Sequence, residues 1–126
     1  MYTLCLKKNF IARHFLIGGD WGDENNPHAH HYVLELRLSA MDLDRHEYLV
    51  DLVEVEGYLD RIISGYRDSM LNKHDSFGDR NPSLELFARI IWEEFSRLLK
   101  DRNIHELSVR LWENESAWAQ WRGRPE

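Results

Sequence analysis

Two long stretches of alternating apolar and polar residues, 2–14 and 28–40, constrain the fold of this chain more than any other feature. Alternation with a period of two is typical of a β-strand with one buried face, because successive side chains point to opposite sides of a sheet. One parity of the first stretch holds Tyr2, Leu4, Leu6, Phe10, Ala12 and His14, and one parity of the second holds His28, His30, Tyr32, Leu34, Leu36 and Leu38. The sequence therefore predicts two strands, separated by a loop rich in turn formers, GGDWGDENNP.

The middle of the chain has the period of a helix. Asp51, with Glu54 three residues later, resembles a capping box and precedes an apolar stripe of Leu52, Val55, Leu59, Ile62, Ile63 and Tyr66. A second helix is predicted to start at Asn81-Pro82, with Asn81 as the cap and Pro82 at the first helical position. Its buried stripe is expected to be Leu84, Phe87, Ala88, Ile91, Phe95 and Leu98.

Alternation returns at residues 106–113, and a short last strand is predicted at 117–122. The resulting order, ββααββ, predicts an α+β fold with a four-stranded antiparallel sheet and both helices on one face. The length of 126 residues fits one domain, 1–126, and its small core would benefit from association into a homo-oligomer.

Composition narrows the functional class. A net charge of −6 argues against a nucleic-acid partner, and no apolar run approaches the roughly 20 residues of a membrane span. No signal peptide is expected at the N-terminus. The single Cys5 excludes a disulfide framework, is consistent with a cytoplasmic protein, and is expected to be a small core or sheet residue.

Three histidines end the inward-facing rows of the two predicted strands. His28 and His30 are two residues apart and share a face, and His14 ends the matching row of the first strand. Three imidazoles at one level of a sheet suit zinc, although copper, iron and nickel also accept this ligand. The alternative is a surface histidine cluster that includes His14 only by coincidence.

Glu113 repeats this pattern, since it follows Val109 and Leu111 on the same parity. A carboxylate at the end of a buried row is costly unless a partner binds it, and a planar ligand with N–H donors would be such a partner. The alternative is that Glu113 lies beyond the sheet edge, in water.

The chain also resembles a known family, that of 6-pyruvoyl-tetrahydropterin synthase and 6-carboxy-tetrahydropterin synthase. The segment FIARH is similar to its F-x-A-x-H motif, HAHHY to H-G-H-N-Y, and RDSMLN to L-D-H-x-L-N. NPSLELFARIIWEEF is similar to N-P-T-x-E-x-L-A-x-x-I-W, VRLWENESAWAQW to the final V-x-V-x-E-T, and VDLVEVEGYL to the aspartate-led start of the first helix.

The resemblance carries a set of expectations. It implies the tunnelling fold (T-fold), in which the sheets of several subunits join into a barrel, as a trimer or as two stacked rings forming a hexamer. It implies active sites at subunit interfaces, Zn²⁺ held by His14, His28 and His30, and a pterin ring anchored by Glu113.

The chain departs from the family pattern where the catalytic cysteine is expected. The position four before His28 holds Glu24, and some family variants carry glutamate there and cleave the side chain of dihydroneopterin triphosphate. A buried carboxylate with a raised pKa can act as a general base. Asp23 is a second candidate for the base, and a solvated acidic loop with no catalytic role is the alternative.

A second departure affects the L-D-H motif. Asp68 is present, but Ser69 replaces the histidine and cannot titrate near neutral pH. His74, in the following loop, is a candidate substitute. Ala29 and His31 replace the glycine and asparagine of H-G-H-N; Ala29 is a mild change, and His31 faces away from the other histidines and is expected to be a packing or interface residue.

Three hypotheses follow. The first is a zinc-dependent enzyme that acts on dihydroneopterin triphosphate or a related dihydropterin as a carbon–oxygen lyase, with Glu24, Asp68 and His74 as candidate catalytic residues. The second is a homologue that binds zinc and a pterin or purine-like ligand without the family's reaction. The third is a structural assembly in which the histidines have no role.

Overall fold

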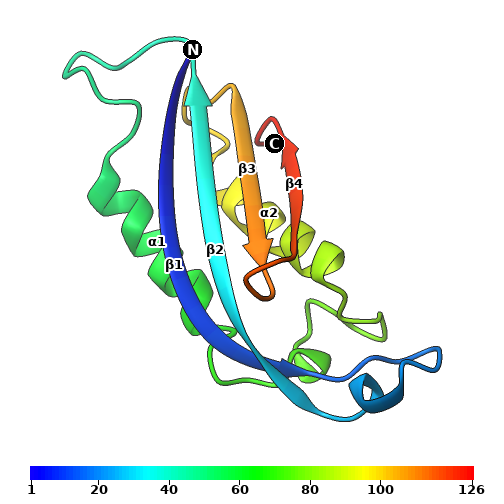
Figure 1. Cartoon of the computed structure of the whole chain (residues 1–126). Helices are drawn as coiled ribbons and strands as arrows, with labels where there is room; N and C mark the ends of the chain where they lie inside the picture. The colour runs from blue at the N-terminus through cyan, green and yellow to red at the C-terminus, as the bar shows by residue number, and fades with distance from the viewer.

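The four predicted strands form one antiparallel sheet. The computed structural model describes every residue from 1 to 126, and its strands are β1 (Tyr2–His14), β2 (His28–Ala40), β3 (Glu106–Trp112) and β4 (Trp118–Gly123). They lie in the order β1-β2-β3-β4. Figure 1 shows β1 and β2 as long, curved strands that extend beyond β3 and β4 at one end of the molecule. The predicted ββααββ order is confirmed.

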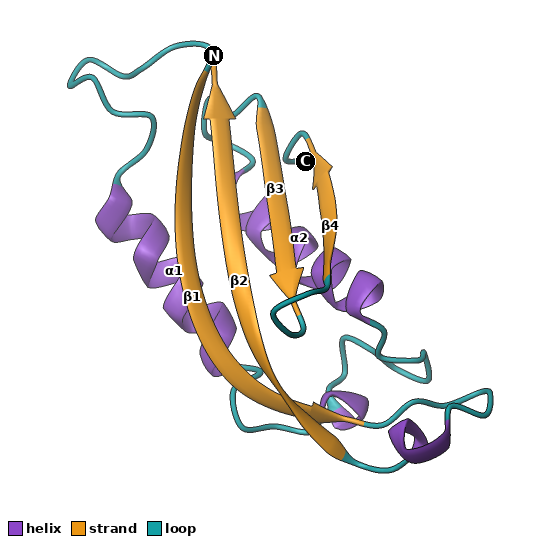
Figure 2. Ribbon diagram, viewed as in Figure 1, coloured by secondary structure: helices purple, strands orange, loops and turns teal.

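Both helices cover the same face of the sheet (Figure 2). They are α1 (Leu52–Ser64) and α2 (Leu84–Leu99), and two short 3₁₀ helices, η1 (Gly22–Asn25) and η2 (Leu71–Lys73), lie in the connections. As predicted, Asp51 caps α1, because its side chain accepts hydrogen bonds from the backbone of Val53 and Glu54. No helix has the length and apolar character needed to cross a membrane.

The predicted start of the second helix is wrong by two residues. The N-cap is Ser83, whose hydroxyl accepts a hydrogen bond from the Leu86 amide at 3.2 Å. The Asn81 side chain instead accepts a hydrogen bond from the Ile17 amide at 2.9 Å. Asn81 and Ser83 are both good caps, and a contact with a residue far away in sequence decides which one is free to cap the helix.

The core lies between the sheet and the helices and follows the predicted parity. It contains Phe10 and Ala12 of β1, the apolar row of β2, and Phe87 of α2, which is fully buried. Burying a side chain such as Phe87 stabilises a fold by about 1.5–3 kcal/mol. Three residues of the predicted helix stripes are less buried: Leu52 is 41% exposed, and Leu84 and Leu98 are partly buried.

Cys5 lies on the exposed face of β1, on the parity of Lys7 and Asn9. The expectation that it is a sheet residue is met, but it is not part of the core. The alternation explains its position, because every odd-numbered side chain of this strand points away from the helices.

Candidate metal centre and adjoining pocket

The strand register brings His14, His28 and His30 together. In the β1–β2 pairing His14 lies opposite His28, and His30 lies opposite Ala12, whose small side chain leaves room for the ring. The ring centroids are 4.5 Å apart for His14 and His28, and 4.9 Å apart for each of the other two pairs. One nitrogen of each ring lies within 4.8 Å of the corresponding nitrogens of the other two, so the three residues can hold one metal ion.

Backbone carbonyls orient two of these rings. Nδ1 of His14 lies 3.0 Å from the carbonyl oxygen of Pro82, and Nδ1 of His28 lies 2.8 Å from that of Asn26. A carbonyl oxygen only accepts hydrogen bonds, so each Nδ1 carries the proton and donates it, and each Nε2 keeps a free lone pair. Metal-binding histidines typically have such a partner on the second ring nitrogen.

Two ring nitrogens are buried without a partner. Nε2 of His28 and Nε2 of His30 make no hydrogen bond, a costly arrangement for buried polar atoms. Nε2 of His30 is 3.2 Å from Oε1 of Glu113, a close contact that lacks the alignment of a hydrogen bond. A divalent cation between the rings would satisfy these nitrogens, and three imidazoles are a donor set that zinc accepts.

Burial favours the neutral form of two of the imidazoles, those of His14 and His30. It lowers the pKa of His14 to about 4, a shift that the neighbouring His28 and His30 increase and the hydrogen bond to Pro82 opposes. Burial also lowers the pKa of His30, and the nearby Glu113 opposes that shift. Neutral imidazole is the form that binds a metal ion, so these rings are ready to bind near neutral pH.

Glu113 faces the histidines from the turn between β3 and β4. Its Oε1 lies 3.2 Å from Nε2 of His30 and 3.9 Å from Nε2 of His14, and a quarter of its side chain is exposed. Glu113 is therefore just beyond the last residue of β3, Trp112, but points back towards the histidines and not into bulk water.

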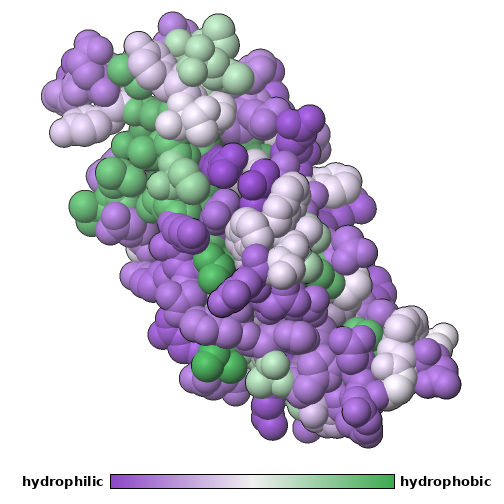
Figure 3. Space-filling view, viewed as in Figure 1, coloured by the Kyte–Doolittle hydropathy of each residue, from purple (hydrophilic) through white to green (hydrophobic).

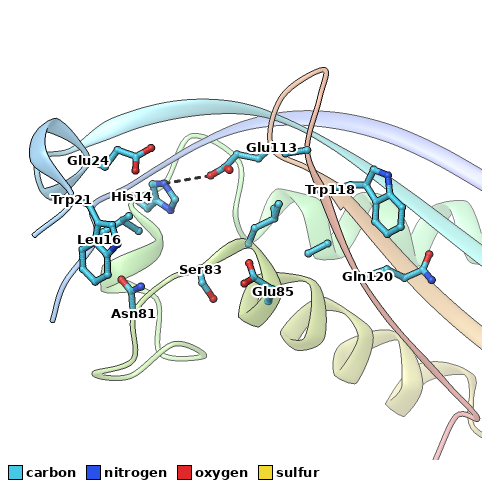
Figure 4. Close-up of a pocket in the computed structure, with 13 residues that line it drawn as sticks. His14, Leu16, Trp21, Glu24, Asn81, Ser83, Glu85, Glu113, Trp118 and Gln120 are labelled. Carbon is cyan, nitrogen blue, oxygen red and sulfur yellow. Dashed lines mark ion pairs between the residues drawn. The ribbon is translucent and has the colours of Figure 1, made fainter. Parts of the chain in front are cut away.

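A pocket of about 570 Å³ adjoins the three histidines, and this volume is enough for a small ligand (Figure 4). Its walls come from the β1–β2 loop, the start of α2 and the β3–β4 hairpin. They comprise His14, Leu16, Trp21, Glu24, Asn81, Ser83, Leu84, Glu85, Glu113, Ala117, Trp118, Ala119 and Gln120. Glu24 is part of this lining and Asp23 is not, so the geometry favours Glu24 between the two candidate bases. Glu24 is exposed, so the burial expected of a general base is not found.

The other two candidate catalytic residues lie elsewhere in the chain. Asp68 is exposed, with a positive φ of 58°, and its amide donates to the carbonyl of Ile11 at 2.7 Å beside the edge strand β1. His74 stacks on Tyr66 with a centroid distance of 4.4 Å and lines a separate cavity with Glu94. Within one chain, neither residue joins the pocket.

His31 lies on the opposite face of the sheet, as expected. Its Nε2 contacts Oδ1 of Asn9 at 3.0 Å, and the residue is exposed. His31 is close in sequence to His28 and His30, and His14 is paired with His28 across the strands. The alternation of β2 nevertheless places His31 on the other face, away from the three clustered histidines.

The sequence interpretation missed several pocket residues. Trp21, Glu85, Trp118 and Gln120 all line the cavity but were not proposed as site residues. For Glu85 a signal existed, since it stands at the glutamate position of the segment NPSLE. The two tryptophans have no such signal, because nothing local indicates that a loop and a hairpin meet at the same cavity.

Comparisons with known proteins agree with this geometry. A sequence profile described as 6-pyruvoyl tetrahydropterin synthase matches residues 3–124. A search among curated proteins found no match. Among solved structures, the 6-pyruvoyl tetrahydropterin synthase of Caenorhabditis elegans superposes with a TM-score of 0.84 at 18% identity, covering 97% of this chain and 95% of that one.

Two further structures share the fold. A catalytic-residue variant of Plasmodium vivax 6-pyruvoyltetrahydropterin synthase has a TM-score of 0.80 at 14% identity, with 98% of each chain covered. An uncharacterized protein from Wolinella succinogenes has a TM-score of 0.72 at 11% identity, covering 99% of this chain and 98% of that one. At these identities the superpositions show the fold, the tunnelling fold of these synthases. Since the family profile spans nearly the whole chain, the protein belongs to the 6-pyruvoyl tetrahydropterin synthase family.

Proposed function

We propose that the protein is a zinc-dependent enzyme that acts on dihydroneopterin triphosphate or a related dihydropterin, as a carbon–oxygen lyase or by cleaving the substrate's side chain. The observation that supports this most is the shared site: His14, Glu24 and Glu113 line one cavity, and His14 clusters with His28 and His30 in a set that can hold one metal ion. Metal-assisted acid–base catalysis requires the metal ligands and the carboxylates to lie within reach of the same bound small molecule.

Each group has a distinct task in this proposal. His14, His28 and His30 hold the zinc ion, which when bound supplies a Lewis acid that lowers the pKa of side-chain hydroxyls on the substrate. Glu113 accepts hydrogen bonds from the amino group and ring N–H of the pterin. Glu24 removes the proton that starts loss of triphosphate or cleavage of the side chain.

A catalytic glutamate has a precedent among the similar structures. Two Plasmodium vivax structures carry alanine or cysteine in place of a glutamate, and both are described as catalytic residue mutants. This description supports, for the present chain, a carboxylate base in place of a thiol.

A second function, binding of a pterin or purine-like ligand without turnover, has its own support. Ser69 cannot transfer a proton near neutral pH, and Asp68 and His74 lie outside the pocket of the same chain. Incubation of the purified protein and zinc with dihydroneopterin triphosphate separates the two functions. Appearance of an altered pterin supports the enzyme, whereas tight pterin binding without any product supports the binding module.

Glu113 is expected to determine pterin affinity. Glu113→Gln replaces an ionised acceptor by a neutral amide, and a hydrogen bond to a charged group is worth about 1.5–3 kcal/mol, so the dissociation constant should rise about 10- to 100-fold. Isothermal titration calorimetry with a dihydropterin measures the change. Glu115→Gln, on the exposed turn two residues later, is the matched control and should bind as the wild type does. Equal affinity of Glu113→Gln and wild type would remove Glu113 from the site.

The shape of the sheet supports association into a ring. β1 pairs with β2 only and β4 with β3 only, so both edges of the sheet are open to another chain. Figure 1 shows that these edges lie on opposite sides of the molecule and that neighbouring strands alternate in direction. A copy that adds its β1 to β4 would therefore continue the antiparallel sheet and propagate it into a closed barrel.

The surfaces beside the two edges differ in character. A groove between β1 and α1 combines Leu4 and Leu52 with two acidic and two basic side chains, and Lys8 pairs there with Asp60. Leu52 and Val53, at the start of α1, are exposed, and Figure 3 shows apolar surface at the end of the molecule where α1 begins. The groove between α2 and β4 has instead two indoles and four guanidinium groups, from Trp92, Trp121, Arg89, Arg97, Arg122 and Arg124. Two unlike surfaces at the two edges suit head-to-tail pairing, in which each copy contributes a different patch to the contact.

This pairing would also place Asp68 near a neighbour's pocket. Asp68 lies beside the end of β1, and β4 begins at Trp118, which lines the pocket. Because β1 and an added β4 run antiparallel, these two ends become neighbours. A site between subunits, in a trimer or a hexamer, is thus compatible with an Asp68 that is remote within one chain.

Trp121→Asp is expected to break the assembly, because it places a carboxylate on the open β4 edge, where Trp121 is 39% exposed. Size-exclusion chromatography with light scattering should show the wild type as a trimer or hexamer and the variant as a monomer of 15.1 kDa. Lys100→Asp, which places the same carboxylate on the exposed turn after α2, should leave the mass unchanged. An unchanged mass for Trp121→Asp would contradict pairing through β4.

A further inference from the structure

The side chain of Asn25 uses all of its hydrogen-bonding groups inside the β1–β2 loop. Its Oδ1 accepts from the Trp21 amide at 2.8 Å, and its Nδ2 donates to the carbonyl oxygens of Leu16 and Gly19, each at 3.0 Å. One side chain thus ties together the beginning, middle and end of a loop with little packing of its own. An amide is the side chain that can donate twice and accept once in this way.

This loop carries Glu24 into the pocket. The carbonyl of Glu24 accepts a hydrogen bond from the Leu16 amide at 2.9 Å. The amide of Glu24 donates a hydrogen bond to the carbonyl of Trp21 at 3.3 Å. Leu16 and Trp21 are two of the three residues that Asn25 holds. The backbone on both sides of Glu24 is therefore fixed by the contacts of Asn25.

The same segment also reaches the metal ligands. The carbonyl of Asn26, directly after Asn25, accepts the hydrogen bond from Nδ1 of His28 at 2.8 Å. A displacement of residues 24–26 would move the carboxylate directly, whereas His28 is held in addition by its strand pairing with His14. Loosening this loop should affect the carboxylate more than the metal site.

We propose that Asn25 is a positioning residue that holds the Glu24 carboxylate in register with the zinc ligands. The proposal rests on the proposed function, in which Glu24 moves a proton. It assigns to Asn25 an effect on turnover through Glu24, without contact to the substrate, since Asn25 does not line the pocket.

Asn25→Asp is the sharpest test, because the two side chains have the same shape. The aspartate keeps an acceptor for the Trp21 amide but loses both donors and places a carboxylate against two carbonyl oxygens. Asn103→Asp is the matched control, since Asn103 is exposed on the turn between α2 and β3. Both variants change one amide to one carboxylate and shift the net charge equally.

Two measurements on the zinc-loaded full chain carry the test. Hydrogen exchange of peptides covering residues 15–27 should be at least 10-fold faster in Asn25→Asp than in the wild type and in Asn103→Asp. With dihydroneopterin triphosphate as substrate, kcat should fall about 100-fold, the effect of a small misplacement of a catalytic group, while KM and zinc content stay unchanged.

The outcomes distinguish this inference from the proposed function. Unchanged exchange in Asn25→Asp overturns the inference whatever the activity. Unchanged kcat in Asn25→Asp, with an inactive Glu24→Gln, also overturns it and leaves the proposed function intact. If Glu24→Gln retains full activity, the proposed role of Glu24 fails, and the positioning role of Asn25 fails with it.

Discussion

The variant His28→Ala is expected to lose its metal ion. The structure leaves Nε2 of His28 buried without a protein partner, and two further imidazole rings lie within 4.9 Å of this ring. Changes in residues that only support metal ligands already weaken binding by about 10- to 100-fold, so removal of a ligand should lower zinc affinity by more than about 100-fold. Elemental analysis should show near-stoichiometric zinc in the wild type and background levels in the variant.

His31→Ala is the matched control for this prediction. His31 is the neighbour of His30, but its ring lies on the exposed face of the sheet and contacts Asn9. This variant loses the same type of side chain from the same strand and should keep its zinc. A wild-type protein without metal, or a His28→Ala variant with full zinc content, would show that the three imidazoles are not a metal centre and would remove the basis of the proposed function.

Replacement of Glu24 by glutamine should abolish turnover while zinc and pterin binding persist. Glutamine has the same shape and keeps the backbone hydrogen bond to Leu16, but it cannot accept a proton. General-base catalysis typically contributes about 100- to 10,000-fold, and kcat should fall by that factor with little change in KM. Single-turnover assays with dihydroneopterin triphosphate measure the loss.

Asp23→Asn tests the competing assignment at the neighbouring position. Asp23 does not line the pocket, and its carbonyl is engaged by the Asn26 amide at 3.0 Å. This variant should keep wild-type activity. Loss of activity in Asp23→Asn together with an active Glu24→Gln would reverse the assignment, and activity in both variants would exclude the loop carboxylates as the base.

The strands and their buried faces were predictable because a half-buried sheet requires alternation over its whole length. All the inward residues assigned to β2, from Tyr32 to Leu38, are fully buried in the structure. The same rule separated His28 and His30 from His31 without any tertiary information. A one-residue error in register would have exchanged the two groups of histidines, so this part of the prediction was strongly constrained.

The start of α2 shows where local patterns are ambiguous. Asn81-Pro82 and Ser83 are both consistent with a helix start, and only the contact between Asn81 and Ile17, 64 residues apart, reveals that Asn81 is occupied elsewhere. The residues that line the pocket could not be predicted for the same reason. Trp21, Glu85 and Trp118 meet because a loop, a helix start and a hairpin converge, and no periodicity describes such a meeting.

The sequence by itself determined the alternating strands, the two amphipathic helices and the histidines that share a face, because these depend on the direction of side chains along a single element. The tertiary structure alone decided that Glu113 faces the histidines, that Glu24 lines the pocket while Asp68 and His74 do not, and that Asn25 ties the loop together. These features depend on the distances between segments that are far apart in the chain, and such distances are set only when the sheet and helices pack around a common core.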